Sequence, residues 1–180
     1  MELRPLSAED RAKLKRDFTQ PAVFDVDGTL RCGAHRLHLL PPLDKFDDPR
    51  AFDAMNMAAV DDSPMWDNIN LLKAIAYAGH PIVLLTRANV VGKPILLAQL
   101  ELWDVPYVEL IMADYEDTRG DREYKEEKIK YIEEKYGTPI AFWDDQPKVC
   151  AHIRSLGYTC HHVVDPYMQS NGVSNEADFN

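Results

Sequence analysis

The sequence predicts an α/β fold in which a parallel sheet lies between two layers of helices. Short apolar runs alternate with helical segments along the 180-residue chain, and several of these runs end directly in acidic or hydroxyl residues. Runs that are continuously apolar, without polar alternation, are typical of parallel strands buried on both faces. Strands that alternate with helices indicate βαβ units with right-handed crossovers. We therefore expect a three-layer, Rossmann-like sheet.

The strands and helices are expected in a regular order. We expect strands at residues 22–24, 81–85, 108–112, 139–143 and 158–163. We expect helices at residues 7–17, 63–79, 94–103, 122–136 and 147–156. Ser63 and Pro64 suit the N-cap and the first turn of the second helix, and Gly79 suits its end.

The length of 180 residues fits a single domain, residues 1–180, with one hydrophobic core. Residues 31–62 interrupt the alternation after the first strand; they contain several prolines and aspartates and show no clear periodicity. This insert is too short to form a second core, so we expect a small lid or flap over the strand end. The polar end of the chain, residues 169–180, is expected to be a loose tail.

Composition and charge narrow the class of protein. With 46% hydrophobic and 28% charged residues, the chain resembles soluble globular proteins, and no apolar run approaches the roughly 18 residues of a membrane helix. We expect a cytoplasmic location and no membrane partner. The net charge of −10 argues against tight binding to long nucleic acid, which relies on lysine and arginine contacts with phosphates. A short nucleic-acid end or a single nucleotide stays compatible with this charge.

Two aspartates end the first expected strand, in the stretch PAVFDVDGTL at residues 21–30. Side chains at i and i+2 of an extended segment point to the same side, so Asp25 and Asp27 can reach one pocket, and Gly28 allows a sharp turn after them. Two carboxylates in one small volume are costly unless a cation neutralises them or one of them holds a proton. Taken alone, the pair also fits an ordinary Asp-Gly-Thr turn.

Two further strands end in polar residues at the same predicted edge of the sheet. Thr86 and Arg87 follow the second strand, and Asp144 and Asp145 follow the fourth. Ligands of parallel sheets collect at the carboxyl ends of the strands, so one shared site explains all of these polar endings. Carboxylate oxygens suit a hard cation such as Mg²⁺. The predicted metal site consists of Asp25, Asp27, Asp144 and Asp145.

The succession of DVDGTL, LLT, a lysine and WDD resembles the four-part signature of the haloacid dehalogenase superfamily of phosphotransferases. The resemblance implies the fold of that superfamily, a Mg²⁺ cofactor and an aspartyl-phosphate intermediate. It implies that Asp25 is the nucleophile and Asp27 the general acid and base. It also implies that Thr86 binds the phosphoryl group and that Lys125 holds its charge. For the acid role, the pKa of Asp27 is expected to be raised by a nearby carboxylate and the apolar strand.

A narrower resemblance lies in DTRGDREYKEE at residues 117–127. This run is similar to the DTRxDxxxKEE run of the phosphatase domains of bacteriophage-type polynucleotide kinase-phosphatases. Members of that family remove 3′-phosphates from nucleic-acid ends and nucleotides. The resemblance implies that Arg119 meets the substrate and that Asp121 orients Lys125. The same residues also fit a charged, solvated helix start with pairs four residues apart.

The chain departs from this family at one motif. The usual Ser-Gly-Arg is replaced by Thr86-Arg87-Ala88, so the arginine comes one position early and its contact with phosphate stays open. Arg87 is kept as a candidate for substrate binding. A kinase half is not recognised in the sequence, so a separate kinase or ligase is a candidate partner, and a homo-oligomer is a further option.

The leading hypothesis is a Mg²⁺-dependent phosphomonoesterase acting on 3′-phosphates of nucleic-acid ends or nucleotides. An alternative is a phosphatase of small molecules, such as nucleoside monophosphates or sugar phosphates, which the acidic charge and the altered arginine favour. A further alternative is a non-catalytic binding module with the same fold. The joint presence of Asp25, Asp27, Lys125, Asp144 and Asp145 argues against that module, because degenerate members should lose at least one of them.

Overall fold

A five-stranded parallel sheet in the order β5-β4-β1-β6-β7 forms the centre of the computed structural model, which describes residues 20–46 and 48–164. Its strands are β1 (Ala22–Phe24), β4 (Ile82–Asn89), β5 (Glu109–Ala113), β6 (Ala141–Asp144) and β7 (Cys160–His162). The predicted parallel α/β architecture is thereby confirmed. The helix expected at 7–17 and the tail expected at 169–180 lie outside the described residues.

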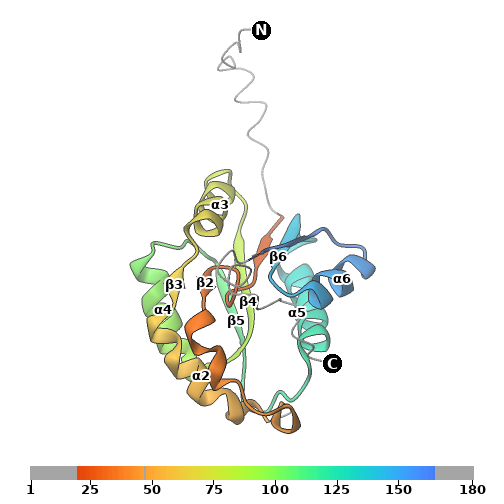
Figure 1. The fold of residues 1–180 in the computed structure, drawn as a ribbon. Coiled ribbons are helices and arrows are strands. Elements are labelled where there is room, and N and C mark those ends of the chain that lie inside the picture. Colours follow the sequence, from red (N-terminus) through yellow and green to blue (C-terminus); the bar gives the residue numbers. More distant parts are fainter. Residues whose placement is uncertain (1–19, 47, 165–180) are drawn as a thin grey trace, which may run out of the picture.

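Helices cover both faces of this sheet, as Figure 1 shows. They are α3 (Trp66–Tyr77), α4 (Lys93–Leu102), α5 (Asp121–Tyr136) and α6 (Pro147–Ser155). Phe24 and Leu84 share a core cluster with residues of α3 and α4. Their strand neighbours Val23 and Val83 share the opposite cluster with residues of α5 and α6. Successive strand residues thus supply opposite cores, which is why the strands are continuously apolar.

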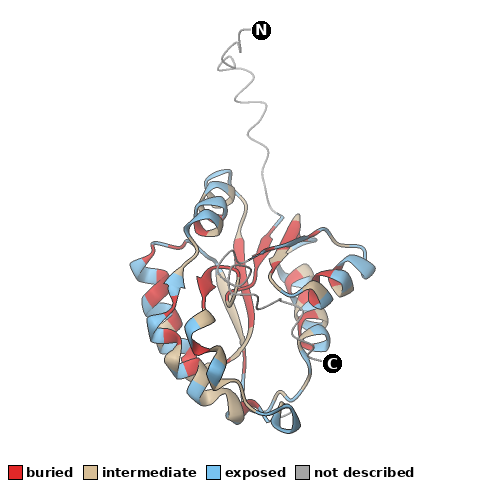
Figure 2. Ribbon diagram, viewed as in Figure 1, coloured by how far each residue is buried: buried red, intermediate tan, exposed pale blue. Residues whose placement is uncertain are grey.

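Burial follows from this layered arrangement (Figure 2). The central strands are buried along most of their length, whereas the helices bury one face and expose the other. β4 continues to Asn89, beyond the predicted end at 85, and its pairing with β5 shifts register between Thr86 and Asn89. No helix in the described part of the chain is both long enough and apolar enough to cross a membrane.

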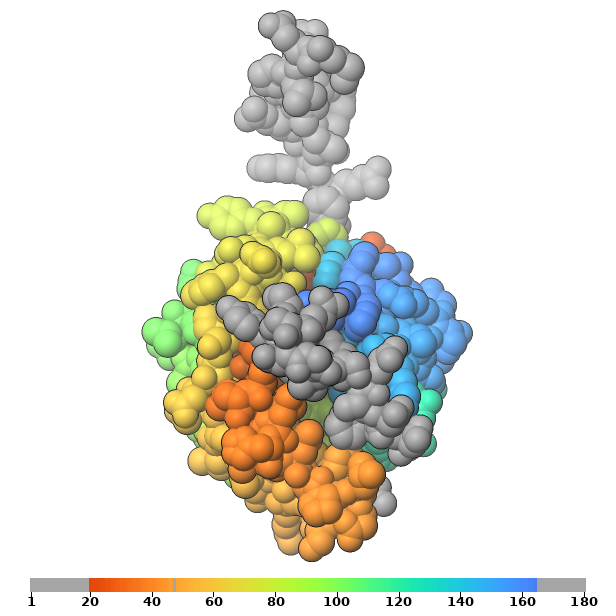
Figure 3. Space-filling view, in the orientation of Figure 1, coloured from red at the N-terminus to blue at the C-terminus, as the bar shows by residue number. Residues whose placement is uncertain are grey.

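The insert after the first strand is closed at its base by a two-stranded antiparallel ribbon of β2 (Arg31–Cys32) and β3 (Ser63–Pro64). Between these strands lie η1 (Ala34–Leu39), η2 (Leu43–Lys45), η3 (Pro49–Phe52), α2 (Asp53–Met57) and η4 (Ala58–Asp61). In the space-filling view the insert, in orange, lies at the front below α3 (Figure 3). The prediction that Ser63 and Pro64 begin a helix is wrong. Their pairing with β2 keeps them extended, and α3 begins at Trp66.

The assignment of the hydrophobic core can be tested by truncating a leucine in β4. Leu84 is fully buried, so Leu84→Ala should lower the free energy of unfolding by about 2–5 kcal/mol, because it leaves a cavity between the sheet and α3 and α4. Leu102→Ala is the matched control, since Leu102 is 79% exposed, and it should change stability by less than about 0.5 kcal/mol. Urea denaturation of both variants measures the difference. Equal stability losses would contradict the assigned core.

Candidate active site

The sheet order places the carboxyl ends of β1, β4 and β6 next to one another. Phe24 is in register with Leu84 of β4 on one side and with Trp143 of β6 on the other. Asp25 directly follows β1, and Asp144 is the last residue of β6. The acidic ends of two neighbouring strands are therefore delivered to one edge, at which Thr86 of β4 also lies.

Lys125 connects two of these carboxylates. It lies in α5 with 3% of its surface exposed, and its Nζ donates to Asp25 Oδ1 at 2.8 Å and to Asp144 Oδ2 at 2.5 Å. Burial alone would lower the pKa of Lys125, but the charges of Asp144 and Asp25 outweigh it and raise that pKa well above its usual range. Lys125 therefore stays charged in this buried position. Its ammonium offsets part of the negative charge of Asp25 and Asp144.

Asp145 packs tightly against the turn that follows β1. Gly28 has a φ of +74°, and a Cβ built on it would lie 2.2 Å from Asp145 Oδ2. Only glycine fits here, because any side chain would meet both the backbone strain and the carboxylate. Burial, reinforced by the charge of Asp144, raises the pKa of Asp145 to about 8.

The site has a surplus of negative charge. Asp25 and Asp144 share the ammonium of Lys125, and Asp145 lies close enough to both for their charges to interact. The atoms of this site that could bind a metal are carboxylate oxygens. An excess of carboxylates fits a hard cation such as Mg²⁺. In the described ranges, no group of three or more acidic, histidine or cysteine side chains is already arranged around one position for an ion. Lys125 lies between the two carboxylates that would be the nearest ligands.

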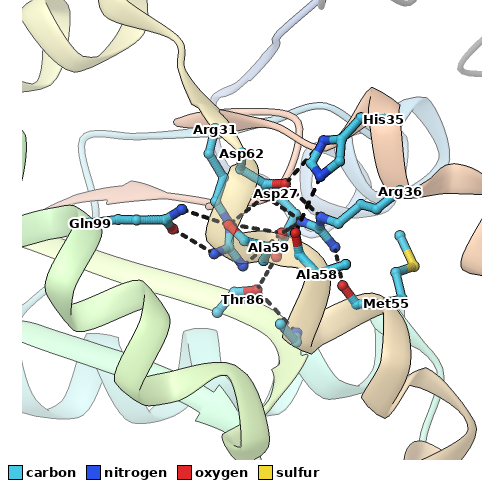
Figure 4. Close-up of polar contacts among 11 residues, drawn as sticks. Asp27, Arg31, His35, Arg36, Met55, Ala58, Ala59, Asp62, Thr86 and Gln99 are labelled. Atoms are coloured by element: carbon cyan, nitrogen blue, oxygen red, sulfur yellow. Dashed lines mark hydrogen bonds and ion pairs between the residues drawn. The ribbon is translucent and has the colours of Figure 1, made fainter.

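Asp27 faces a pair of arginines from the insert, drawn in Figure 4. Its Oδ1 accepts from Arg31 Nε at 3.0 Å and from Arg36 Nη2 at 2.5 Å. The hydroxyl of Thr86 donates to Asp27 Oδ2 at 3.3 Å. The Gly28 N–H donates to the Arg31 carbonyl at 2.8 Å. The tight turn therefore brings Arg31 close to Asp27. The Asp27 carboxylate is thus paired with arginines, and the structure does not join it to Lys125.

The pKa of Asp27 is lowered, and the prediction that it would be raised is wrong. Burial by itself would raise the pKa, but the charges and hydrogen bonds of Arg31 and Arg36 outweigh burial and bring it to about 2. The prediction considered only a neighbouring carboxylate and the apolar strand, whereas the arginines come from the insert. Asp27 is therefore ionised in the substrate-free site.

Arg87 points to the loop that precedes α5. Its guanidinium donates to the carbonyl oxygens of Asp117, at 2.7 Å, and Arg119, at 3.0 and 2.8 Å. The guanidinium carbon also lies over the ring of Tyr124, 5.4 Å from its centroid. These contacts give Arg87 a role in anchoring the loop. The guanidinium predicted to bind substrate is bound here to carbonyl oxygens of that loop.

Arg119 and Asp121 lie at the start of α5. The Arg119 guanidinium pairs with Asp117, at 2.7 Å, and with Glu127, on the outer side of the helix. Asp121 accepts from Gln146 at 3.0 Å, and its charge contributes to the raised pKa of Lys125. Asp121 thus supports Lys125 electrostatically, whereas the structure leaves Arg119 with acidic neighbours at the surface.

Residues 19–166 match the model of a family described as the polynucleotide kinase PNKP phosphatase domain. The chain belongs to this family. The resemblance seen in the sequence is thereby confirmed, and the phosphatase domain has the fold of the haloacid dehalogenase superfamily. None of the curated proteins matches the chain.

Solved structures show the same fold. A chain of the Pnkp1/Rnl/Hen1 RNA repair complex has 21% identity and a TM-score of 0.63, and the match covers 81% of this phosphatase domain and 42% of that chain. A second Pnkp1/Rnl/Hen1 complex gives 22% identity and a TM-score of 0.62, covering 83% and 47%. The phosphatase domain therefore spans less than half of those chains. A HAD family enzyme from Bacteroides thetaiotaomicron, in complex with magnesium and inorganic phosphate, has 13% identity and a TM-score of 0.55, covering 84% and 98%.

Sequence reasoning left the arginines of the insert without a role, and so it missed the buried polar network that holds Asp27. Arg36 binds Asp62 through Nε at 2.8 Å and Nη2 at 2.7 Å, and Arg31 Nη1 donates to Gln99 Oε1 at 2.8 Å (Figure 4). These side chains come from the insert and from α4, so no local motif joins them. The available signal was the pair of arginines shortly after the two aspartates, in an insert otherwise rich in acidic residues. The network makes the insert part of the site.

The contact between Gly28 and Asp145 generates a prediction. Gly28→Ala should displace the Asp145 carboxylate and lower phosphatase activity at least about tenfold, besides costing about 1–2 kcal/mol for a side chain at positive φ. Gly157→Ala is the matched control, because Gly157 also has a positive φ, +94°, but nothing lies within 4 Å of its added Cβ. It should lose similar stability and keep its activity. Phosphate release and urea denaturation measure the two effects, and equal activity in both variants would contradict the role of this contact.

Proposed function

We propose that the chain is a Mg²⁺-dependent phosphomonoesterase that removes 3′-phosphates from nucleic-acid ends or nucleotides. The observation that carries the proposal is the buried contact of Lys125 with Asp25 and Asp144, in a member of the PNKP phosphatase domain family. A phosphate dianion repels an attacking carboxylate, so the attack needs nearby positive charge. Lys125 supplies such a charge next to the carboxylate that would attack.

Mg²⁺ would be held by Asp25 and Asp144, with Asp145 beside them. When bound, the ion would offset the charge of the phosphate and of the surplus carboxylates. The HAD family enzyme of similar fold in complex with magnesium and inorganic phosphate supports this choice of cation. The oxygen-only donor set supports it as well, because zinc would favour histidine or cysteine ligands.

In the first step the Asp25 carboxylate attacks phosphorus, and the bond from phosphorus to the leaving oxygen breaks. Lys125 would balance charge on the transferred group, and Thr86 would bind it. The hydrogen bond from the Ala88 N–H to Thr86 Oγ1, at 3.1 Å, supports this role because it orders that hydroxyl. The product is an aspartyl-phosphate on Asp25. Such covalent intermediates divide one difficult displacement into two easier ones.

Asp27 handles the protons of both steps. Its ionised state in the free site suits the second step, in which it would take a proton from the water that hydrolyses the aspartyl-phosphate. The first step requires a proton for the leaving alkoxide, and the free site does not hold one on Asp27. A phosphate monoester, whose second pKa is about 6, can bring that proton into the site. Asp27 would then pass it to the leaving oxygen.

We also propose that residues 31–62 act as a fixed wall or lid of this site within a single domain. The arginines of this insert reach Asp27, and its middle part is bound to Asn89 of β4. A separate kinase or ligase remains a proposed partner. The similar chains found in Pnkp1/Rnl/Hen1 complexes, one of which is described as an RNA repair complex, support the proposal of a partner.

A phosphatase of small molecules is the second candidate. The net charge of −10 disfavours extended contacts with nucleic acid, and Arg87 is bound to carbonyl oxygens of the loop before α5. A single nucleotide or a sugar phosphate would need neither an extended basic surface nor this arginine.

A substrate panel separates the two candidates. We expect Mg²⁺-dependent phosphate release from a 3′-phosphorylated oligonucleotide and from 3′-mononucleotides, at least about tenfold faster than from their 5′-phosphorylated counterparts or a sugar phosphate. A chelator should abolish release, and added Mg²⁺ should restore it. A clear preference for 5′-phosphates or sugar phosphates would refute the 3′-phosphatase proposal and leave the mechanism standing.

Substitution of the two aspartates tests the mechanism. Asp25→Asn should abolish turnover, because the nucleophile is lost, whereas Asp27→Asn should slow it by about 10²–10⁴-fold and leave substrate binding intact. Asp67→Asn, the same chemical change at an exposed position of α3, should remain fully active. Steady-state kinetics and trapping of the phosphorylated protein check these outcomes. Near-normal activity of Asp25→Asn would show that the nucleophile is misassigned.

A further inference from the structure

Tyr115 is held in a fixed position just beyond the carboxyl end of β5. Its hydroxyl donates to both carboxylate oxygens of Asp53, at 3.1 and 3.2 Å. Asp53 Oδ1 also accepts from Asn89 Nδ2 at 3.2 Å, and Asn89 is almost fully buried in β4. The aromatic ring is therefore tied to the insert and, through Asn89, to the central sheet.

Arg50 of η3 lies over this ring. The centre of its guanidinium is 5.5 Å from the Tyr115 ring centroid, which is within the range of a cation–π contact. Asp48 caps η3 and accepts from the Arg50 N–H at 3.0 Å, so the backbone that carries Arg50 is also ordered. Arg50 is exposed and Tyr115 is partly exposed. Together they form a cationic and aromatic surface that solvent can reach.

This pair lies at the same edge of the sheet as the proposed catalytic groups. Asn89, to which Asp53 is bound, comes three residues after Thr86 in β4, a separation of about 10 Å along an extended strand. Asn89 is in register with Ala113, two residues before Tyr115. In Figure 1 the tip of the insert and the loop from β5 to α5 lie side by side at the bottom of the view. A nucleotide whose phosphate is at Asp25 could extend toward this pair.

We propose that Tyr115 and Arg50 form a stacking platform for a nucleobase at or next to the phosphorylated end of the substrate strand. This inference rests on the proposed function and specifies which part of the substrate is recognised besides the phosphate. Aromatic rings and arginine planes are the surfaces on which unstacked bases bind. They tolerate different bases, because every base has a π-face. The platform would also provide affinity that does not depend on extended contacts with phosphates, which the net charge of −10 disfavours.

A purely structural role of Tyr115 is the competing explanation, because its hydroxyl connects the loop to the insert. The two roles depend on different atoms. Tyr115→Phe removes the hydrogen bonds to Asp53 and keeps the ring, whereas Tyr115→Leu removes the ring as well. Comparison of these two variants therefore separates the platform from the connection.

The test uses the full chain, a 3′-phosphorylated oligonucleotide and the same oligonucleotide with its last two nucleotides abasic. For the unmodified oligonucleotide, Tyr115→Leu should raise KM by about 5- to 150-fold, the range expected when one stacked base is lost, with little change in kcat. Tyr115→Phe should keep a KM close to that of the wild type. For the abasic oligonucleotide, all three proteins should have the same raised KM. Urea denaturation verifies that the variants are folded.

Three results would overturn the platform: an unchanged KM in Tyr115→Leu, equal losses in Tyr115→Phe and Tyr115→Leu, or a wild-type KM that does not depend on the bases. Each can occur while the wild type still removes 3′-phosphates, so the platform can fail although the proposed function stands. Inactivity of the wild type on every 3′-phosphorylated substrate would instead defeat the proposed function. The same variants assayed with 5′-mononucleotides and a sugar phosphate would then decide the platform separately.

Discussion

The charged contact of Lys125 with Asp25 and Asp144 is the constraint on which the site depends. The three residues come from α5, β1 and β6, and all are buried. Removing such charges from water costs several kcal/mol per ion, and their mutual attraction repays this only with good geometry. Well-packed apolar side chains could fill the same space at lower cost. Retention of this set of charges at a strand edge is therefore better explained by chemistry than by stability.

Two carboxylates of the same site experience opposite surroundings. Asp27 faces two arginines and has a pKa of about 2, whereas Asp145 lies near Asp144 and has a pKa of about 8. Divergent environments of this kind are what assign different proton roles to identical groups. The carboxylates around Lys125 fit a cation, whereas the two arginines are balanced by Asp27 and Asp62. The surplus charge of the site is therefore negative and lies on the side of Asp145.

The sequence predicted those features that depend on local pattern and chain order. The apolar runs marked the strands, and their polar endings marked the edge at which Asp25, Thr86 and Asp144 lie. The sequence-based predictions were wrong where the conformation or the pKa of a residue depends on a partner distant in the sequence. Ser63 and Pro64 carry a helix-start pattern, but β2 pairs with them and keeps them extended. In the same way, the pKa of Asp27 depends on two arginines of the insert, and their spacing in the sequence does not predict that they contact Asp27.

The sheet and the insert contribute different groups to the site, because the insert contacts the rest of the domain at two places. One end of the insert delivers the arginines to Asp27, and its middle part holds Arg50 and Asp53 against Tyr115. The sheet and α5 hold the groups that would transfer the phosphoryl group. In our proposal, the insert lies beside the part of the substrate beyond that group. Under this proposal, a change in the sequence of the insert would alter substrate choice without moving Lys125. A scaffold built this way can keep one chemistry while its substrate range changes.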